Sequence, residues 1–409
     1  MNNKYLFLTE SFASSANANS ICIKKIVKEF QNLCDICVIS KNKTCSKNNL
    51  GIEEIQLPNR PWDRLSLKAS KGKKKNVITL FLKGLLFLKR LLMLPIWPVY
   101  SLSCSFHFYK SASTIIKEKQ ITHVIAVCYP GDTLLAMCLL KLRYGKKIKT
   151  IMYPLDVFVC GKYDGFSVEN KLSSFFSLIF SNICAMFSDK IIVLENAVDC
   201  YEKRLKYHKL KFEICGLPLI HKYEPVNRIQ KRESIHFVYG GNIIKSIRNP
   251  DYLFKILNNY CCLMNENICI DIYGSINKQL LNDFILKYNS IKFNYFGWVS
   301  EEDLSNAICD ANAVISIGNS VGHLIPSKIF KYMSLKKPII HLNFIDEDPC
   351  LPYLKKYGHT FFVENGVDVD LDDFRLWLKS LESCEISLDC EKMFPQCTPA
   401  YTARVIQSC

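Results

Sequence analysis

The stretch "IPSKIFKYMSLKKPII", residues 325–340, predicts a helix that leads directly into a buried strand. The helix is expected to begin at Pro326 or Ser327, and the Ser327 hydroxyl is well placed to accept a hydrogen bond from an unpaired backbone N–H group. Two lysines, Lys328 and Lys331, lie three residues apart and therefore share one face of the helix. Positive charge at a helix start favours a negatively charged ligand, so this stretch predicts an anion site beside a sheet.

The same order of strand and helix recurs on both sides of this stretch. Residues 20–30 have the spacing of a helix with one apolar face, and helical segments separate the other short apolar runs. Apolar strands separated by helices predict parallel sheets that are covered on both faces. The expected strands are residues 4–10, 34–40, 123–129, 149–156, 190–195, 235–241, 268–274, 291–299, 313–318 and 338–343.

A polar stretch, residues 221–234, interrupts this alternation and is typical of a linker. The sequence therefore predicts an α/β fold with two Rossmann-like domains, residues 1–217 and 218–395. Ligands of such sheets gather at the carboxyl ends of the strands. We therefore expect the site in a cleft where the two domains face each other.

The chain of 409 residues carries a formal net charge of +15, which favours acidic partners such as phosphates, nucleotides or anionic lipid. No nucleic-acid-binding module is recognisable, so we expect no nucleic acid partner. The 20 cysteines are scattered and no Cys-x-x-Cys pair recurs at zinc-ligand spacing, which favours a reducing cytoplasm. The apolar run at the N-terminus stops at Glu10, so no secretion signal is expected.

Residues 71–100, "KGKKKNVITLFLKGLLFLKRLLMLPIWPVY", combine a lysine cluster with leucine and aromatic residues. Lys83, Lys89 and Arg90 break the apolar run, whereas a membrane-spanning helix needs roughly 20 largely apolar residues. The segment is typical of a helix that lies on an anionic membrane surface. A buried helix that follows a solvated lysine loop is the alternative that these residues leave open.

A second group of candidate residues follows the expected strand 235–241. Gly240 and Gly241 end this strand, and Lys245 and Arg248 come shortly before the next helix. Glycine lets the backbone approach a ligand closely, and a lysine and an arginine at the end of a strand can hold a diphosphate. Solvated basic residues in an ordinary strand-to-helix turn are the alternative.

The expected first domain offers two further features. Asp156 ends a predicted strand, where its carboxylate could orient an acceptor hydroxyl or simply form a turn. Residues 9–20 form a loop of small residues, where backbone could pass close to a phosphate or a sugar. This loop lacks the GxGxxG spacing of a dinucleotide-binding turn, which argues against NAD.

Together these motifs resemble the GT-B-fold glycosyltransferases related to family 4, especially bacterial enzymes that assemble surface polysaccharides such as capsule and exopolysaccharide. The resemblance covers nearly the whole chain and rests most of all on "HLIPSKIFKYMSLKKPII". It is supported in order by "ESFASSANANSICIKKIVKEF", "MYPLDVF", "SDKIIVLE", "CGLPLI", "VYGGNIIKSIRNPDYL" and "FNYFGWVSEEDL". Such enzymes use a nucleotide-activated sugar, bind it mainly with the second domain, and usually need neither a metal nor another cofactor.

The resemblance implies a role for each candidate residue. Lys245 and Arg248 would hold the donor diphosphate and stabilise the departing nucleotide. The rest of the donor site would comprise Gly240, Gly241, Gly274, Trp298, Val299, Ser327 and Lys328. The acceptor side would comprise Asp156, Ala16, Asn17, Asn19 and Ser20. Residues 396–409 would form a helix that crosses back to the first domain.

The chain departs from the family's pattern at three positions. Family members often carry two glutamates eight positions apart, one near the donor sugar and one at the nucleotide ribose. His323 and Lys331 occupy these positions here, and a lysine cannot accept hydrogen bonds from ribose hydroxyls. Lys336 replaces the glycine that usually precedes "KP". These departures bear on the ribose contact and leave the expected fold unchanged.

The leading hypothesis is a cytoplasmic glycosyltransferase, peripheral on the inner face of the plasma membrane. It would move a sugar from a nucleotide donor to a lipid-linked glycan acceptor, with retention of configuration. A catalytically degenerate homologue that acts as a binding partner is one alternative, motivated by His323 and Lys331. A nucleotide-sugar 2-epimerase on the same fold is another, although such an enzyme has little use for the segment 71–100.

Overall fold

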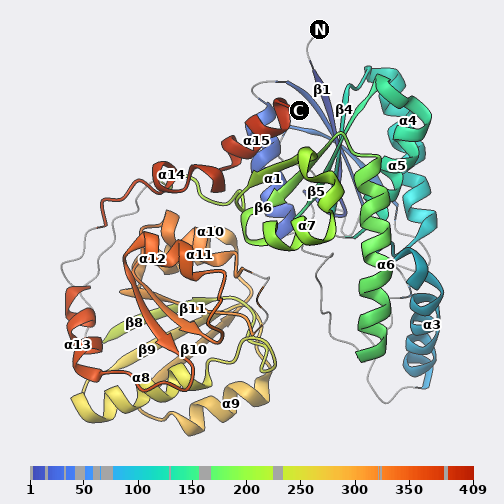
Figure 1. The fold of residues 1–409 in the computed structure, drawn as a ribbon. Helices are drawn as coiled ribbons and strands as arrows, with labels where there is room; N and C mark the ends of the chain where they lie inside the picture. The colour runs from blue at the N-terminus through green and yellow to red at the C-terminus, as the bar shows by residue number, and fades with distance from the viewer. Residues whose placement is uncertain are drawn as a thin grey trace. The chain divides into compact units, whose positions relative to one another are not determined.

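The computed structural model of the chain describes residues 3–13, 17–31, 34–41, 51–58, 65, 77–128, 130–155, 167–223, 234–320, 322, 325–381 and 386–409. The chain divides into two compact units. The first unit comprises Met1–Pro218 together with Gln396–Cys409, and the second comprises Leu219–Pro395. Each unit contains a parallel sheet with helices packed on it (Figure 1).

The first unit is built around a seven-stranded sheet with the order β3-β2-β1-β4-β5-β6-β7. Its strands are β1 (Lys4–Leu8), β2 (Asp35–Lys41), β3 (Glu53–Leu57), β4 (His123–Cys128), β5 (Lys149–Pro154), β6 (Lys190–Leu194) and β7 (Phe212–Cys215). Its longer helices are α1 (Ala18–Gln31), α3 (Val77–Met93), α4 (Leu102–Lys119), α5 (Asp132–Tyr144), α6 (Ser167–Met186), α7 (Val198–Arg204) and α15 (Pro399–Gln407). The inner strands are almost wholly buried because helices cover both faces of the sheet.

The second unit contains a six-stranded sheet with the order β10-β9-β8-β11-β12-β13. Its strands are β8 (Ile235–Gly240), β9 (Ile268–Tyr273), β10 (Ile291–Gly297), β11 (Ala313–Ile317), β12 (Ile339–Asn343) and β13 (Thr360–Glu364). Its helices are α8 (Asp251–Met264), α9 (Lys278–Lys287), α10 (Glu301–Asp310), α11 (Lys328–Ser334), α12 (Leu351–Tyr357), α13 (Leu371–Ser380) and α14 (Cys390–Met393). The predicted α/β fold with two parallel-sheet, Rossmann-like domains is confirmed.

In both sheets the first strand of the unit is central. β1 pairs with β2 on one side and β4 on the other, and β8 pairs in the same way with β9 and β11. Ligands of doubly wound sheets bind outside the carboxyl ends of the strands, where the strand order reverses. The carboxyl ends of β8 and β11 therefore mark the place where the second unit is expected to bind a ligand.

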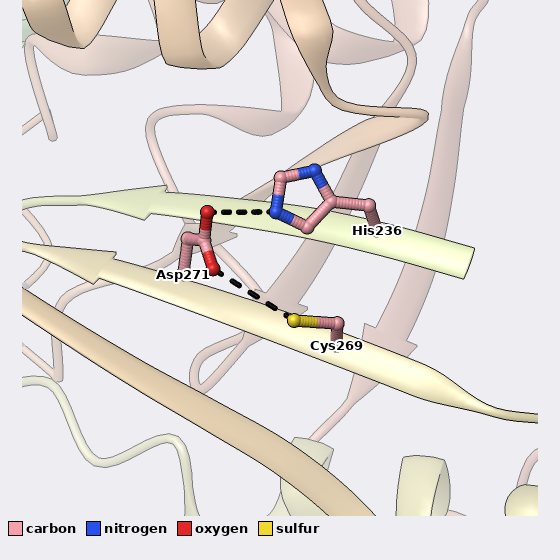
Figure 2. Close-up of side chains that lie close together, drawn as sticks. All are labelled: His236, Cys269 and Asp271. Atoms are coloured by element: carbon pink, nitrogen blue, oxygen red, sulfur yellow. Dashed lines mark hydrogen bonds and ion pairs between the residues drawn. The ribbon is translucent and has the colours of Figure 1, made fainter. Parts of the chain in front are cut away.

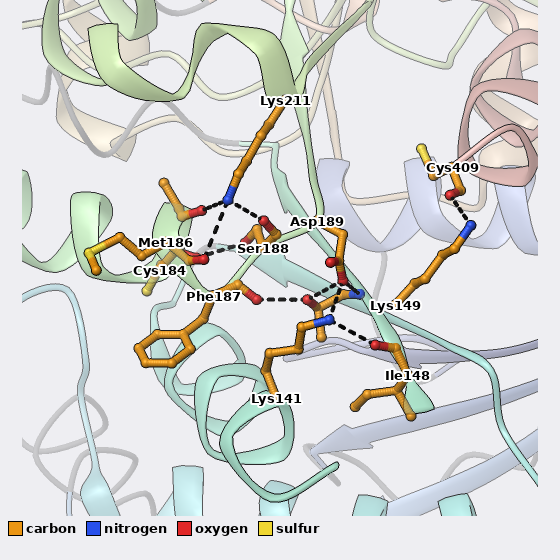
Figure 3. A network of polar contacts seen from close by, with 12 residues as sticks. Lys141, Ile148, Lys149, Cys184, Met186, Phe187, Ser188, Asp189, Lys211 and Cys409 are labelled. Carbon is orange, nitrogen blue, oxygen red and sulfur yellow. Dashed lines mark hydrogen bonds and ion pairs between the residues drawn. The ribbon is translucent and has the colours of Figure 1, made fainter. Parts of the chain in front are cut away.

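A network of lysines and an aspartate ties together the amino ends of β5 and β6 (Figure 3). Lys141 Nζ donates to the Asp189 carboxylate at 2.6 Å, and the same carboxylate accepts from the backbone N–H of Thr150 at 2.7 Å. Lys149 Nζ donates to the carbonyl oxygen of Cys409 at 2.7 Å. Since α15 also packs against α1, the C-terminal residues are held within the first unit.

His123 makes the stability of the first unit dependent on pH. Its ring is buried at the start of β4 and stacks on Tyr5, with 4.8 Å between ring centroids. Burial, aided by the charge of Lys149, lowers the pKa of His123 to about 4. An unfolded histidine titrates near 6.5, so below that pH the unfolded chain binds a proton that the folded chain does not.

We therefore expect the free energy of unfolding to fall by about 2 kcal/mol between pH 7.5 and pH 5. Urea unfolding at the two pH values measures this loss. In the His123→Phe variant the aromatic stacking is kept and the titrating group is removed, so the loss is expected to shrink. An equal loss in both proteins would contradict the assignment to His123.

Candidate active site

Glycines bring the loops after β8 and β9 into contact. Gly274 follows β9 with a φ of +116°, which residues with a side chain rarely adopt. A Cβ atom at Gly274 would lie 2.2 Å from the carbonyl oxygen of Gly241, so no side chain fits there. The backbone N–H of Gly241 donates to the carbonyl of Tyr273 at 2.8 Å. Gly240 is the last residue of β8. At this edge of the sheet, Gly240, Gly241 and Gly274 therefore present backbone instead of side chains.

Arg248 spans the point where the strand order reverses. Its Nε donates to the side-chain oxygen of Asn319 at 2.5 Å, and Asn319 lies buried just after β11. The backbone N–H of Ser320 also donates to the carbonyl of Ile247 at 3.1 Å. The loops after β8 and β11 are therefore joined twice, and they hold a half-buried guanidinium at the ligand-binding edge of the sheet.

Lys245 lies in the same loop as Arg248 but is exposed. The loop is closed at its base because the backbone N–H of Arg248 donates to the carbonyl of Ile244 at 2.7 Å. Both cations follow the carboxyl end of β8, in the loop where sequence reasoning expected them. Their contact with a diphosphate stays a prediction.

Gly318 and Asp348 support the loop that carries Asn319. A Cβ atom at Gly318 would lie 2.2 Å from Oδ2 of Asp348, so the loop passes directly over this carboxylate. Although burial raises the pKa of Asp348, the hydrogen bond and charge of His341 hold it below its usual value. The ionised carboxylate also accepts from the backbone N–H of Cys350 at 2.8 Å. This buried arrangement fixes the loop beside Arg248.

Tyr332 attaches α11 to the end of β8. Its hydroxyl accepts a hydrogen bond from the backbone N–H of Gly240 at 3.1 Å, and the side chain is buried. The predicted hydroxyl cap at Ser327 is not formed, because Ser327 already has helical backbone angles and accepts no capping hydrogen bond. The first turn starts at Pro326, one of the two expected positions, where the Pro326 carbonyl accepts from the N–H of Ile329 at 3.1 Å.

Helix α11 ends at a lysine in a conformation that favours glycine. Lys336 has a φ of +53°. Its N–H donates to the Met333 carbonyl at 2.9 Å, and the N–H of Lys337 donates to the Tyr332 carbonyl at 3.1 Å. These two bonds form a Schellman motif, whose left-handed residue is most often glycine. This left-handed backbone conformation explains why glycine is usual at this position in the glycosyltransferases that the sequence resembles.

We expect Lys336→Gly to raise the free energy of unfolding by about 1 kcal/mol, because it relieves the left-handed strain of a residue with a side chain. Urea unfolding of the second-unit transition measures this gain. Lys336→Ala is the matched control, since it removes the same long side chain but keeps a Cβ atom. Equal stability of the two variants would show that the backbone conformation is not the cause.

Lys331 is 7% exposed and is paired with Glu301, the first residue of α10. Its Nζ lies 2.6 Å from Oε1 of Glu301, and it also donates to the Glu301 carbonyl oxygen at 3.3 Å. Burial lowers the pKa of both Lys331 and Lys328, and the charge of Glu301 opposes that effect in each case. The Glu301 side chain is 59% exposed, so a carboxylate held by a buried lysine faces solvent here.

Trp298 and Val299 connect β10 with α10. Trp298 is 72% exposed, and Val299 is half-buried. The backbone N–H of Gly274 donates to the carbonyl of Gly297 at 2.7 Å, which places this connection beside the glycine contact described above. Trp298 and Val299 therefore lie at the carboxyl edge of the second sheet, and their contact with a base stays a prediction.

The expected acceptor loop, residues 9–20, is described only in part, and it ends earlier than expected because Asn19 and Ser20 belong to helix α1. Asn17 caps α1, since its side-chain oxygen accepts from the backbone N–H of Ser20 at 2.8 Å. Ser20 is buried, and its hydroxyl donates to the carbonyl of Phe12 at 2.9 Å, so it holds the loop in place. Asn19 is half-buried. The remaining predicted site residues, Ala16, Asp156 and His323, lie outside the described residues.

A buried cluster of potential metal ligands lies at the opposite ends of the strands (Figure 2). His236 Nε2 lies 2.8 Å from the Asp271 carboxylate, and Asn294 donates to the same carboxylate at 2.8 Å. Burial raises the pKa of Cys269, which favours the thiol form that donates to Asp271. Both carboxylate oxygens thus accept hydrogen bonds from side chains. We interpret the cluster as a polar link between β8, β9 and β10.

Sequence reasoning missed two residues that shape the second-unit edge, Asn319 and Glu301. Asn319 stands in "IGNS" directly after a predicted strand, which is a recognisable position for a ligand-binding or supporting residue. Glu301 lies within the motif that contains Trp298, but nothing in the sequence links it to Lys331. That link requires α10 and α11 to lie beside each other, which only the fold provides.

Comparisons with known proteins place the fold. No family model matches the chain, and no curated protein matches it. Among solved structures, a lipopolysaccharide outer core galactosyltransferase, WaaB, is 12% identical, with a TM-score of 0.56 over 99% of this chain and 98% of that chain. A glycosyltransferase from Rickettsia africae is 12% identical, with a TM-score of 0.59 over 99% of this chain and 93% of that chain.

The same architecture also occurs in an enzyme of another class. A putative UDP-N-acetylglucosamine 2-epimerase from Listeria monocytogenes is 8% identical, with a TM-score of 0.54 over 100% of this chain and 95% of that chain. At such low identities these likenesses establish the fold and not the reaction. The chain thus has the two-domain α/β architecture of the GT-B type.

Proposed function

We propose that the chain is a glycosyltransferase of polysaccharide biosynthesis, which moves a sugar from a nucleotide-sugar donor to a lipid-linked glycan acceptor. The second unit would bind the donor, and the first unit would bind the acceptor. The observation that carries the proposal is the Arg248 guanidinium, which Asn319 holds where the strand order of the second sheet reverses.

A guanidinium at this place suits a diphosphate, because its planar N–H groups match pairs of phosphate oxygens. In the transfer, the bond between the sugar's anomeric carbon and the diphosphate oxygen breaks, and a bond to the acceptor oxygen forms. Negative charge then collects on the departing nucleoside diphosphate. Arg248 and Lys245 would stabilise that charge, and the backbone of Gly240 and Gly241 would approach the phosphates closely.

We propose that Glu301 makes the contact with the nucleotide ribose that Lys331 cannot make. A carboxylate accepts hydrogen bonds from two neighbouring ribose hydroxyls, which Lys331 cannot do. The Lys331 ammonium holds the Glu301 carboxylate at 2.6 Å, and that carboxylate is exposed at the start of α10, three residues after Trp298. We assign Glu301 the ribose role that the family gives to the position of Lys331.

The remaining parts of the proposal rest on the family resemblance and on the cations of this site. Transfer is proposed to need no metal, since Arg248 and Lys245 supply positive charge at the diphosphate. The anomeric configuration is proposed to be retained. The location is proposed to be the cytoplasmic face of the plasma membrane, where a lipid-linked acceptor is available.

Titration calorimetry with uridine, guanosine and adenosine diphosphates tests the donor site first. We expect the wild-type protein to bind one of them, and Glu301→Gln to bind it more weakly while its binding of the 2′,3′-dideoxy analogue is unchanged. The matching nucleotide sugar is then incubated with lipid-linked glycans in the presence of EDTA, and the anomeric configuration of the product is read by NMR.

The alternatives differ in the outcome of these two steps. Absence of nucleotide binding overturns the proposal and favours the degenerate homologue, which the His323 and Lys331 departures motivate. Conversion of the donor sugar to its 2-epimer without transfer would identify a 2-epimerase. Transfer that requires a divalent metal would overturn the metal-independent part alone.

A further inference from the structure

Helix α3 exposes most of its apolar side chains. Scattered exposed hydrophobic residues are ordinary, whereas a contiguous group on one element marks an interaction surface. Along α3 the exposed apolar residues are Ile78, Leu80, Phe81, Phe87, Leu88, Leu91 and Leu92. Within the described parts of the chain, no helix is long and apolar enough to cross a membrane.

Helix α6 exposes an apolar stripe, while its buried face mixes serines with the apolar Phe180, Cys184 and Ala185. It buries Ser173, Ser177 and Ser181, which recur every four residues. The opposite stripe is exposed and consists of Leu172, Phe175, Ile179, Ile183 and Met186. Three- and four-residue spacing places these side chains on one face. A contiguous apolar stripe that is left in water is suited to a partner that covers it.

The two helices belong to one surface. α3 and α6 lie side by side in the first unit (Figure 1), and both pack against the short helix η1 (Leu94–Ile96). Lys211 fixes the C-terminal end of α6, because its Nζ donates to the carbonyls of Ala185 and Ser188 at 2.8 and 2.7 Å (Figure 3). We call the exposed apolar residues of both helices the α3–α6 surface.

The charges around the α3–α6 surface are positive. Helix α3 carries Lys83, Lys89 and Arg90, and its sequence contains no acidic residue. Arg90 lies over the ring of Trp97, 5.6 Å from the ring centroid, just beyond the end of the helix. An apolar stripe flanked by cations suits the boundary between acyl chains and anionic headgroups.

We propose that the α3–α6 surface docks the first unit on an anionic lipid bilayer. The apolar side chains of both helices enter the acyl boundary, while Lys83, Lys89 and Arg90 contact lipid phosphates. A second copy of the chain is a poorer occupant, because a symmetric interface would bring these cations against one another. The inference does not rest on the proposed function, since binding to a bilayer requires no turnover.

Cosedimentation with vesicles of phosphatidylcholine, with and without phosphatidylglycerol, tests the proposal on the full chain. We expect the wild-type protein to bind the anionic vesicles at least tenfold more tightly than the neutral ones. Lys83→Gln is expected to weaken binding to the anionic vesicles about fivefold, which is the contribution of one basic residue near a membrane surface. Phe175→Glu combined with Ile179→Glu is expected to weaken it tenfold or more, because α6 can no longer enter the acyl boundary.

Leu286→Glu is the matched control, since Leu286 is an exposed apolar residue on α9 of the second unit. It is expected to bind vesicles like the wild-type protein, and all variants are expected to keep the wild-type melting temperature. Equal binding by wild type and the Phe175/Ile179 variant would overturn the proposal. So would a wild-type dimer in sedimentation velocity that those two substitutions dissolve, because the surface would then belong to a second copy.

Discussion

We expect Arg248→Ala to lower kcat/KM for sugar transfer, or for donor hydrolysis, by about 100- to 1000-fold, the usual effect of removing one charge-stabilising donor. The Arg248 Nε donates to Oδ1 of Asn319 at 2.5 Å, at the point where the strand order of the second sheet reverses. Its position therefore does not depend on a bound ligand. Alanine removes the charge that would face the leaving diphosphate. Calorimetry with the nucleoside diphosphate measures the loss of binding, and a steady-state assay measures the loss of kcat/KM.

Two variants separate this role from a general effect of charge. Arg248→Lys keeps the charge but loses the planar fork, so it is expected to recover only part of the activity. Lys255→Ala removes an exposed cation on α8 that contacts the ring of Tyr252, and it is expected to leave activity unchanged. If Arg248→Ala retains activity within about threefold of wild type, the guanidinium does not stabilise the transition state.

Gly274→Ala is expected to destabilise the second unit by more than about 3 kcal/mol and to abolish nucleotide binding. The φ of +116° is unfavourable for any residue with a Cβ atom. That Cβ would also lie 2.2 Å from the carbonyl oxygen of Gly241, so one of the two loops must move. Urea unfolding and calorimetry measure the two effects.

Gly358→Ala separates backbone conformation from steric overlap. Gly358 has a φ of +78°, and a Cβ atom there would have no neighbour within 4 Å. Only the conformational cost of about 1 kcal/mol is therefore expected, with nucleotide binding unchanged. A Gly274→Ala variant no less stable than Gly358→Ala would mean that the loops after β8 and β9 separate without cost.

Most of the strands that could be predicted are rich in apolar residues and lie inside their sheet. β4 and β9 are buried at every residue, so helices on both faces leave a clear apolar signal in the sequence. Three edge strands, β3, β7 and β13, were not predicted. They lie at the ends of their sheets and are largely half-buried or exposed, so polar residues interrupt their pattern.

The candidate site was predictable where its residues follow a strand directly. Gly240, Gly241 and Gly274 come immediately at strand ends, so the alternation of strands and helices places them at one edge. The partners of the cations were not predictable. Arg248 meets Asn319 across 71 positions, and Lys331 meets Glu301 across 30, because the strand order and helix packing bring these segments together.

The Lys331–Glu301 pair also constrains how this gene can change. A carboxylate at position 331 would stand against Glu301 in a nearly buried place, and two like charges there would repel. Neither residue can therefore be exchanged for the opposite charge alone without loss of stability. Homologues with lysine at position 331 are expected to keep an acidic residue at position 301. Homologues with glutamate at position 331 are expected to carry a neutral or basic residue at position 301. The residues at these two positions are therefore expected to covary.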